Sequence, residues 1–428
     1  MRMPLMSNRR MGTVATALAV SLALAGCGFV PIRTEPAVPP QVIDAASPAG
    51  YHKIRAFDDG RGVREGAPDD LDRAVITRMT SGRTFDLLAL SGGGDAGAFG
   101  AGVLNGWTQR GDRPQFDYVT GVSTGALIAP MAFLGPRYDA ALRSFYTETT
   151  SSDILLLRPL KVLSGASAVG DSTPLKRQIE AVVTPQMVNE IAAERRKGRM
   201  LLIGTSDLDA QQQVVWDIGR IAASNQPDRV ELIHKILLAS ASIPGAFPPV
   251  AIDVTADGRR YQELHVDGGV TRGVFAYPSA FKLPASKTQR RMWVVRNSKM
   301  APEPQATKQG LVSIASRSLS TLIKGQALSN VEDMQRLAAR DGFAFNVTAV
   351  PSSLLLTEAR AFDQQYMRTL YNAGVQMGRS PQGWAPTLAP LLVPSPVLPD
   401  NATNATPVTT TAARQTTTAR PVRAVAQN

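Results

Sequence analysis

From about residue 85 onward, short apolar runs alternate with longer, helix-length stretches along the chain. Phe85–Leu90 is apolar at every position but one, which is typical of a strand buried on both faces. Ala96–Gln109 has the length of a helix and ends shortly before Gly111, a residue type that often terminates helices. Asp117–Thr120 predicts a second strand and Ala126–Leu134 a second helix. Two such units in succession predict adjacent parallel strands joined by right-handed crossovers.

The later part of the chain repeats this mixture of strands and helices. Asp257-Gly258 lies between two apolar runs and predicts a hairpin turn. The other expected elements are strands at Leu201–Gly204, Val214–Ile218, Val250–Val254, Tyr261–Val266, Met292–Arg296 and Phe343–Val350, and helices at Leu232–Ala241 and Phe362–Met377. We therefore predict one α/β domain over residues 75–384.

Both ends of the chain have compositions that do not build a hydrophobic core. Residues 28–50 contain five prolines and few charges, so we expect an extended tether within an N-terminal extension over residues 27–74. Residues 385–428 contain seven prolines and nine threonines, and their last acid is Asp400. This composition predicts a disordered tail.

The first 26 residues have the pattern of an export signal rather than of a folded segment. Arginines precede the uncharged run Met11–Gly26, whose apolar centre, Val14–Leu24, is too short to span a bilayer. The run ends in Leu24-Ala25-Gly26-Cys27, which resembles the lipobox of bacterial lipoproteins. The resemblance implies cleavage after residue 26 and acylation of Cys27 as a lipid anchor. Gly28 implies an outer-membrane lipoprotein of the cell envelope, and an ordinary signal peptide with an incidental cysteine is the alternative.

Composition excludes several classes of protein. Apolar residues make up 44% of the chain and charged residues 19%, which excludes disorder of the whole chain. A single cysteine excludes a disulfide framework and any cysteine-based zinc site. Three histidines, His52, His234 and His265, leave little material for a histidine-rich metal centre. The net charge of +11 suits an anionic membrane surface and equally an ordinary solvated surface.

Ser123 is the candidate nucleophile. Gly121-Val122-Ser123-Thr124-Gly125 fits G-x-S-x-G and lies between an expected strand and an expected helix. In this context the serine occupies a sharp turn with its hydroxyl exposed, and the flanking glycines provide room for that turn. The helix N-terminus behind it supplies positive potential where an oxyanion would form. The alternative is a glycine-rich packing turn.

A glycine-rich loop follows the first expected strand. Three consecutive glycines, Gly92, Gly93 and Gly94, expose backbone amides at a helix start, which is a cradle for an anion. If the first two strands are parallel neighbours, this loop lies at the same sheet edge as Ser123, and the Thr124 amide is a further oxyanion donor. The spacing also matches a dinucleotide-binding fingerprint. That interpretation is disfavoured because Asp117, the nearest candidate for the required acid, lies at the start of its strand instead of at its end.

The base that activates the serine has two candidates. An α/β-hydrolase requires an acid and then a histidine after the serine, and only His234 and His265 follow Ser123. Asp267 instead ends an expected strand directly before Gly268-Gly269, and strand ends are where α/β active sites collect. Partial desolvation would raise the pKa of this carboxyl and make it a better base. The alternatives are an Asp-Gly turn residue and a Ser–His–Asp esterase that uses His265.

Together these motifs resemble the patatin-like phospholipases, which use a Ser–Asp dyad. The matches are S-G-G-G-x-x-G at 91–97, G-x-S-x-G at 121–125, a proline-containing segment at 239–249 and Asp267-Gly268-Gly269. The resemblance implies a three-layer α/β/α fold with a mostly parallel central sheet. It also implies hydrolysis of acyl esters, with Ser123 and Asp267 as the catalytic pair and without a metal or cofactor.

One position departs from the family pattern. Ala96 stands where the family usually has Arg or Lys, which puts a preference for phospholipids in doubt. Arg272, near the Asp267 loop, is a candidate replacement, and the basic stretch 287–299 could face lipid headgroups or solvent. We expect a membrane-anchored serine acyl hydrolase, either a phospholipase A-type enzyme or a lipid esterase, with no nucleic-acid partner. A non-catalytic envelope lipoprotein that binds lipid or a partner is the alternative, and the oligomeric state stays open.

Overall fold

The fold is built on a mixed sheet with the strand order β1-β7-β6-β3-β2-β10-β11. A computed structural model describes residues 32–61, 68–157, 168, 170–278, 283, 287–304, 306–354 and 361–393. The strands of the sheet are β1 (Arg55–Phe57), β2 (Phe85–Leu90), β3 (Tyr118–Val122), β6 (Met200–Asp207), β7 (Gln212–Asp217), β8 (Val250–Ala256), β9 (Arg259–Asp267), β10 (Arg290–Arg296) and β11 (Phe343–Ala349). The run from β6 to β11 is parallel, whereas β1, β7, β8 and β9 pair antiparallel. A separate two-stranded sheet joins β4 (Leu156–Leu157) and β5 (Gly170–Asp171).

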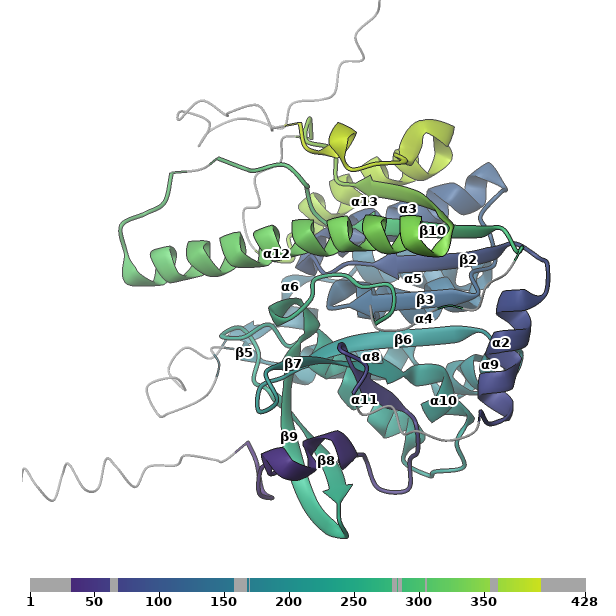
Figure 1. The fold of residues 1–428 in the computed structure, drawn as a ribbon. Helices are drawn as coiled ribbons and strands as arrows, with labels where there is room; N and C mark the ends of the chain where they lie inside the picture. The colour runs from purple at the N-terminus through teal and green to yellow at the C-terminus, as the bar shows by residue number, and fades with distance from the viewer. Residues whose placement is uncertain are drawn as a thin grey trace, which may run out of the picture.

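Helices cover both faces of this sheet (Figure 1). They are α2 (Asp70–Thr80), α3 (Gly97–Arg110), α4 (Thr124–Leu134), α5 (Asp139–Thr147), α6 (Ser151–Ile154), α8 (Thr173–Val182), α9 (Pro185–Arg196), α10 (Ile218–Ala223), α11 (Arg229–Ser240), α12 (Leu311–Asp341) and α13 (Gln364–Arg379). Side chains of β2 alternate between two cores, with Leu88 and Leu90 on one side and Leu87 and Ala89 on the other. The predicted three-layer α/β/α fold with mostly parallel central strands is therefore confirmed.

Different helices cover the two faces of the sheet, and they pack in different ways. On the face that carries α3 and α4, helices α3 and α13 pack with their backbones almost in contact. A Cβ added at Gly102 of α3 would lie 2.0 Å from the carbonyl oxygen of Tyr371 on α13. The opposite face is covered by α2 and by the second half of α12, whose buried apolar residues are Ala327, Val331, Met334, Leu337 and Ala338.

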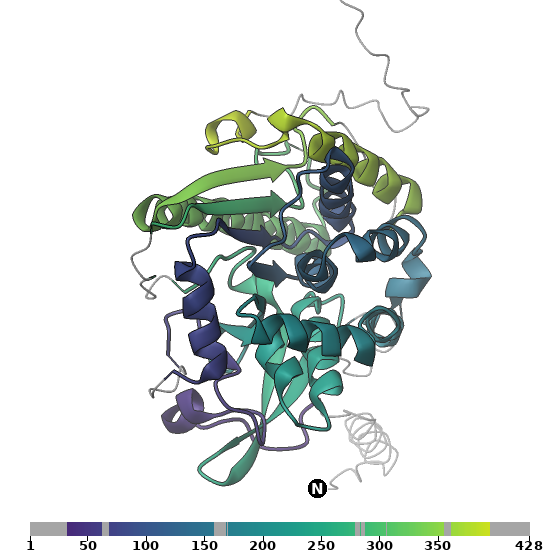
Figure 2. The same cartoon turned by 90° about the vertical axis from the view of Figure 1, so that its right-hand side faces the viewer.

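The N-terminal segment differs from the extended tether expected for residues 28–50. Its described part, residues 32–61, lies against the domain beside the hairpin of β8 and β9 (Figures 1 and 2). Ser47 forms an isolated bridge with Thr255 of β8, and β1 adds an edge strand to β7. Arg55 of β1 is buried and donates to Glu263 of β9 at 2.9 Å. Residues within 27–74 therefore complete the sheet.

The C-terminal segment also continues past the expected domain boundary at 384. Ala385 bridges Val347 of β11, and the rings of Trp384 and Trp107 lie 4.7 Å apart. The predicted signal peptide at 1–26, Cys27 and residues 394–428 of the predicted tail lie outside the described residues. Within the described part of the chain, no helix is both long enough and apolar enough to cross a membrane.

Candidate active site

Ser123 lies at a sharp turn between β3 and α4, as the sequence pattern predicts. Its backbone has φ 55° and ψ −126°, a conformation that costs a residue with a side chain about 1–3 kcal/mol. The surrounding structure holds it there, since the Ser123 amide donates to the Ser240 hydroxyl at 3.0 Å and that hydroxyl donates to the Gly204 carbonyl at 2.7 Å. A side chain at Gly125 would meet the Leu90 carbonyl oxygen at 2.3 Å, so the glycine lets the turn pack against β2.

Strand register brings Asp267 to the same place. β3 pairs with β6 as far as Val122 opposite Gly204, and β7 occupies the other edge of β6. β9 pairs with β6 from Asp267 opposite Thr205, so it continues the edge that β3 leaves. Asp267 is thus the first residue beyond the carboxyl end of β3, where Ser123 also lies. The two strand pairings, β3 with β6 and β6 with β9, thus bring together two residues that lie more than a hundred positions apart in the sequence.

The Asp267 carboxyl group is buried, with an exposed fraction of 6%, and it is only partly hydrogen-bonded. One oxygen, Oδ1, accepts from the Gly269 amide at 2.7 Å, and the other, Oδ2, makes no fully formed hydrogen bond. Burial raises the pKa of Asp267 to about 6, opposed by hydrogen bonding from the Ser123 hydroxyl and from the Gly269 amide. A carboxylate that titrates near neutrality beside a hydroxyl has the properties of a general base.

The glycine-rich loop presents some of its amides to this site. Gly93 and Gly94 are partly exposed, line the cleft beside Ser123, and use their amides in none of the hydrogen bonds between described residues. The Thr124 amide, at the first position of α4, is equally unused. The predicted donor Gly92 differs, because its amide donates to the Gly273 carbonyl at 2.9 Å and is not available to a substrate.

Two cavities meet at Ser123. A cleft of about 730 Å³ extends from Ser123 and Asp267 past the glycine loop to the wall formed by α12. A narrow pocket leads from Ser123 in the other direction, and its lining is almost wholly apolar. Its walls include Leu127, Phe145, Ile154, Leu175, Phe247 and Met367. The pocket has a volume of only about 30 Å³, whereas the cleft is far larger and is also lined mostly by apolar groups. Of the two cavities, the cleft is therefore the one with room for a lipid acyl chain at Ser123.

Arg272 does not replace the cation that is missing at Ala96. Ala96 is buried, and Arg272, the candidate replacement, instead pairs with Asp58 at 2.6 Å. Arg296 belongs to the basic stretch 287–299 that was expected to face lipid headgroups or solvent, but its side chain is buried. It ends β10, lines the cleft and donates from Nη1 to the Gly92 carbonyl at 3.2 Å. Its position at the carboxyl end of a parallel strand is the signal that could have identified it.

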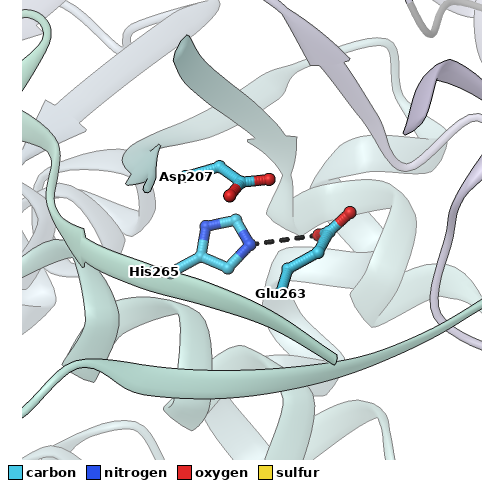
Figure 3. Close-up of side chains that lie close together, drawn as sticks. All are labelled: Asp207, Glu263 and His265. Carbon is cyan, nitrogen blue, oxygen red and sulfur yellow. Dashed lines mark hydrogen bonds and ion pairs between the residues drawn. The ribbon is translucent and has the colours of Figure 1, made fainter. Parts of the chain in front are cut away.

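His265 does not take part in the site. It is fully buried, and its Nε2 lies 3.1 Å from Glu263 while its Nδ1 lies 3.0 Å from the Thr205 hydroxyl (Figure 3). With both ring nitrogens engaged away from Ser123, a Ser–His–Asp triad through His265 has no geometric support. The interpretation as a polar strand residue with satisfied hydrogen bonds fits instead.

The cluster around His265 is the one group of potential metal ligands among the described residues. Asp207, Glu263 and His265 offer ligand atoms within 4.8 Å of one another (Figure 3). Arg55 pairs with Glu263, however, and its charge would repel a bound cation. Opposite charges on Arg55 and Glu263 make the cluster an internal ion-pair network that attaches β1 to β9.

Part of the chain matches a known protein family. A family model described as patatin-like phospholipase matches residues 88–278, a range that contains Ser123, Asp267 and the glycine loop but not Arg296. No curated protein sequence matches the chain.

Solved structures are similar at low identity. VipD from Legionella pneumophila is 10% identical, with 69% of this chain and 66% of VipD covered and a TM-score of 0.35. ExoU from Pseudomonas aeruginosa, in complex with SpcU, is 14% identical, with 69% of this chain and 51% of ExoU covered and a TM-score of 0.33. The chain thus spans between half and two thirds of the length of these structures. Residues 88–278 of this chain, which include Ser123 and Asp267, are thus similar to the patatin-like phospholipases.

Proposed function

We propose that this protein is a serine acyl hydrolase of lipids, either a phospholipase A-type enzyme or a lipid esterase, with Ser123 and Asp267 as its catalytic dyad. The family supports a lipid hydrolase in general. The observation that carries the finer proposal is the register of β9 on β6, which puts a buried carboxyl with a raised pKa beside the serine at the β3–α4 turn.

The chemistry follows from the groups at this point. Asp267 accepts the proton of the Ser123 hydroxyl as the oxygen attacks the ester carbonyl. The amides of Gly93, Gly94 and Thr124 stabilise the negative oxygen of the tetrahedral intermediate. The leaving alcohol takes the proton from Asp267, and an acyl group remains on Ser123. Water, activated by the same carboxylate, then releases the fatty acid.

The size and the mostly apolar lining of the cleft support a substrate with an apolar acyl chain. The narrow pocket beyond Ser123 is apolar, and the open cleft is walled by the first half of α12. That half exposes Ile314, Leu319 and Leu322, with exposed fractions of 49%, 39% and 70%. It also carries Arg317 and Lys324, of which Lys324 pairs with Glu303 at 2.7 Å. We propose that α12 faces the lipid surface from which the substrate enters, since apolar and cationic side chains together favour an anionic membrane.

A fluorophosphonate probe tests the dyad directly, because it reacts only with an activated serine. The wild-type protein should label, and Ser123→Ala should not. Ser144→Ala, a change on α5 outside both cavities, is the matched control and should label like the wild type. Hydrolysis should then be measured with short p-nitrophenyl esters, phospholipids and lysophospholipids. A folded wild-type protein that neither labels nor hydrolyses any of these esters would leave a lipid-binding protein as the function.

A further inference from the structure

Arg296 is a buried cation without an anionic partner. Its exposed fraction is 5%, and no carboxylate lies within ion-pair distance of it among the described residues. Burial lowers the pKa of its guanidinium to about 10, so the group still carries its charge at neutral pH. Holding an unpaired charge in the interior is costly, and such groups concentrate at functional sites.

The register of the sheet places Arg296 at the glycine loop. Val295 of β10 lies opposite Leu90, the last residue of β2, so Arg296 is one residue farther along the same edge. Its Nη1 donates to the Gly92 carbonyl at 3.2 Å. The Ser91 hydroxyl donates to the same carbonyl at 2.7 Å. Two donors therefore hold the carbonyl oxygen of Gly92, which is the first residue of the predicted oxyanion loop.

The opposite end of this peptide group is the Gly93 amide. The Gly92 carbonyl and the Gly93 N–H belong to one planar unit, so fixing the oxygen also fixes the direction of the N–H. Donors on the oxygen polarise the unit and strengthen the N–H as a donor. The loop has little freedom to turn otherwise, since a Cβ at Gly93 would lie 2.1 Å from the Asn297 carbonyl oxygen. The Gly93 amide itself has no partner among the described residues.

We propose that Arg296 is a positioning residue of the oxyanion hole, which acts through the Gly92–Gly93 peptide group and replaces the cation missing at Ala96. The guanidinium orients and polarises the Gly93 N–H toward the oxygen that becomes negative in the tetrahedral intermediate. Its own charge, unpaired in the resting protein, gains an anion nearby only when that intermediate forms. The stabilisation therefore belongs to the transition state, and its loss lowers kcat more than it raises KM. This inference rests on the proposed function.

The test compares Arg296→Met, Arg296→Lys and Arg272→Met. Arg272 is the matched control, because its partner is Asp58 and it is not in the cleft. The substrate is p-nitrophenyl butyrate, and butylboronic acid serves as an analogue of the tetrahedral intermediate. Arg296→Met should lower kcat by about 100-fold, in the range found for loss of an oxyanion donor, with KM little changed. The affinity for the boronic acid should fall with kcat. Arg296→Lys should recover part of both, and Arg272→Met should match the wild type.

The outcomes separate this inference from the proposed function. If the wild type hydrolyses the ester and Arg296→Met retains its kcat and its boronic acid affinity, Arg296 has no such role and the proposed function stands. If Arg296→Met loses activity but binds the boronic acid as tightly as the wild type, the oxyanion role is equally excluded. If Arg296→Met does not fold, Ser91→Ala decides, because it removes the other donor to the Gly92 carbonyl. It should lower kcat and boronic acid affinity together by about tenfold. A wild type without esterase activity contradicts the proposed function itself.

Discussion

Burial of the Asp267 carboxyl lowers the stability of the folded protein. The carboxyl is buried with one oxygen lacking a fully formed hydrogen bond, and burial raises its pKa to about 6 from an ordinary value of 3.8. Well below pH 4 the group is protonated in both the folded and the unfolded chain, so its raised pKa does not reduce the free energy of unfolding. As the pH rises from 4 to 6, the unfolded chain releases the proton first, and the folded protein loses stability relative to it.

Asp267→Asn should therefore stabilise the protein while it abolishes the activity. The amide keeps an oxygen for the Gly269 N–H and removes the buried charge. A shift of about two pKa units corresponds to roughly 3 kcal/mol, which is the upper limit of the expected gain at pH 8. Urea unfolding at pH 8 and pH 4.5 measures it, and the gain should shrink at the lower pH. A variant that is less stable than the wild type at pH 8 contradicts this account of Asp267.

Ester hydrolysis should depend on the ionisation of the same group. The base works only when deprotonated, so kcat/KM for p-nitrophenyl butyrate should rise as the pH increases through about 6 and then level off. His265→Gln should leave this midpoint in place, because the ring faces Glu263 and Thr205 rather than Ser123. A midpoint that moves or disappears in this variant would assign the titration to the histidine.

At the scale of elements, the conspicuous one is α12, because only half of it belongs to a core. Its second half covers the sheet, whereas the exposed first half projects beyond the sheet (Figure 1). The pattern of the sequence does not predict this helix. Among the residues of α12 whose side chains the structure describes, buried positions recur at helical spacing only from Ala327 onward, and the first half of the helix carries apolar, small and cationic residues.

Leu322→Asp should weaken hydrolysis at a lipid surface without changing the catalytic centre. Insertion of an exposed leucine into lipid is worth about 1.5–3 kcal/mol, so activity on anionic phosphatidylglycerol vesicles should fall by roughly tenfold or more. Activity on soluble p-nitrophenyl butyrate should stay as in the wild type. Ile76→Asp on α2 is the control, since Ile76 is also an exposed apolar residue, at 44%, and lies away from the cleft. Equal losses for the two variants on vesicles would remove α12 as the lipid-facing element.

At the scale of the whole molecule, the site depends on parts of the chain outside the family match. The matched range, residues 88–278, ends before β10, so Arg296, β11, α12 and α13 all follow it. β1 precedes it, and Arg55 of β1 pairs with Glu263 on the strand that ends in Asp267. The sheet edge that carries the candidate active site is therefore built from residues both inside and outside the matched range.

The proposed anchor is also a property of the whole molecule, because it concerns where the site works. Cys27→Ser should abolish incorporation of labelled palmitate and release the protein from the membrane fraction, while esterase activity is retained. Gly28→Asp should keep the label and move the protein from the outer to the inner membrane. Palmitate incorporation into Cys27→Ser equal to that of the wild type would exclude Cys27 as the acylated residue.

Local features were predictable from the sequence by itself. The turn at Ser123 was identified because turn geometry depends on neighbouring residues, and of the three glycines in the loop the sequence correctly predicted amides at Gly93 and Gly94 that are free of partners among the described residues. The apolar run of β2 and the helix stop at Gly111 were readable for the same reason. Only the tertiary structure decided how distant segments meet: Asp267 beyond the end of β3, the Gly92 amide on Gly273, Arg272 on Asp58 and Arg296 on the Gly92 carbonyl. Strand register and the packing of whole layers determine such contacts, and no short stretch of residues contains that information.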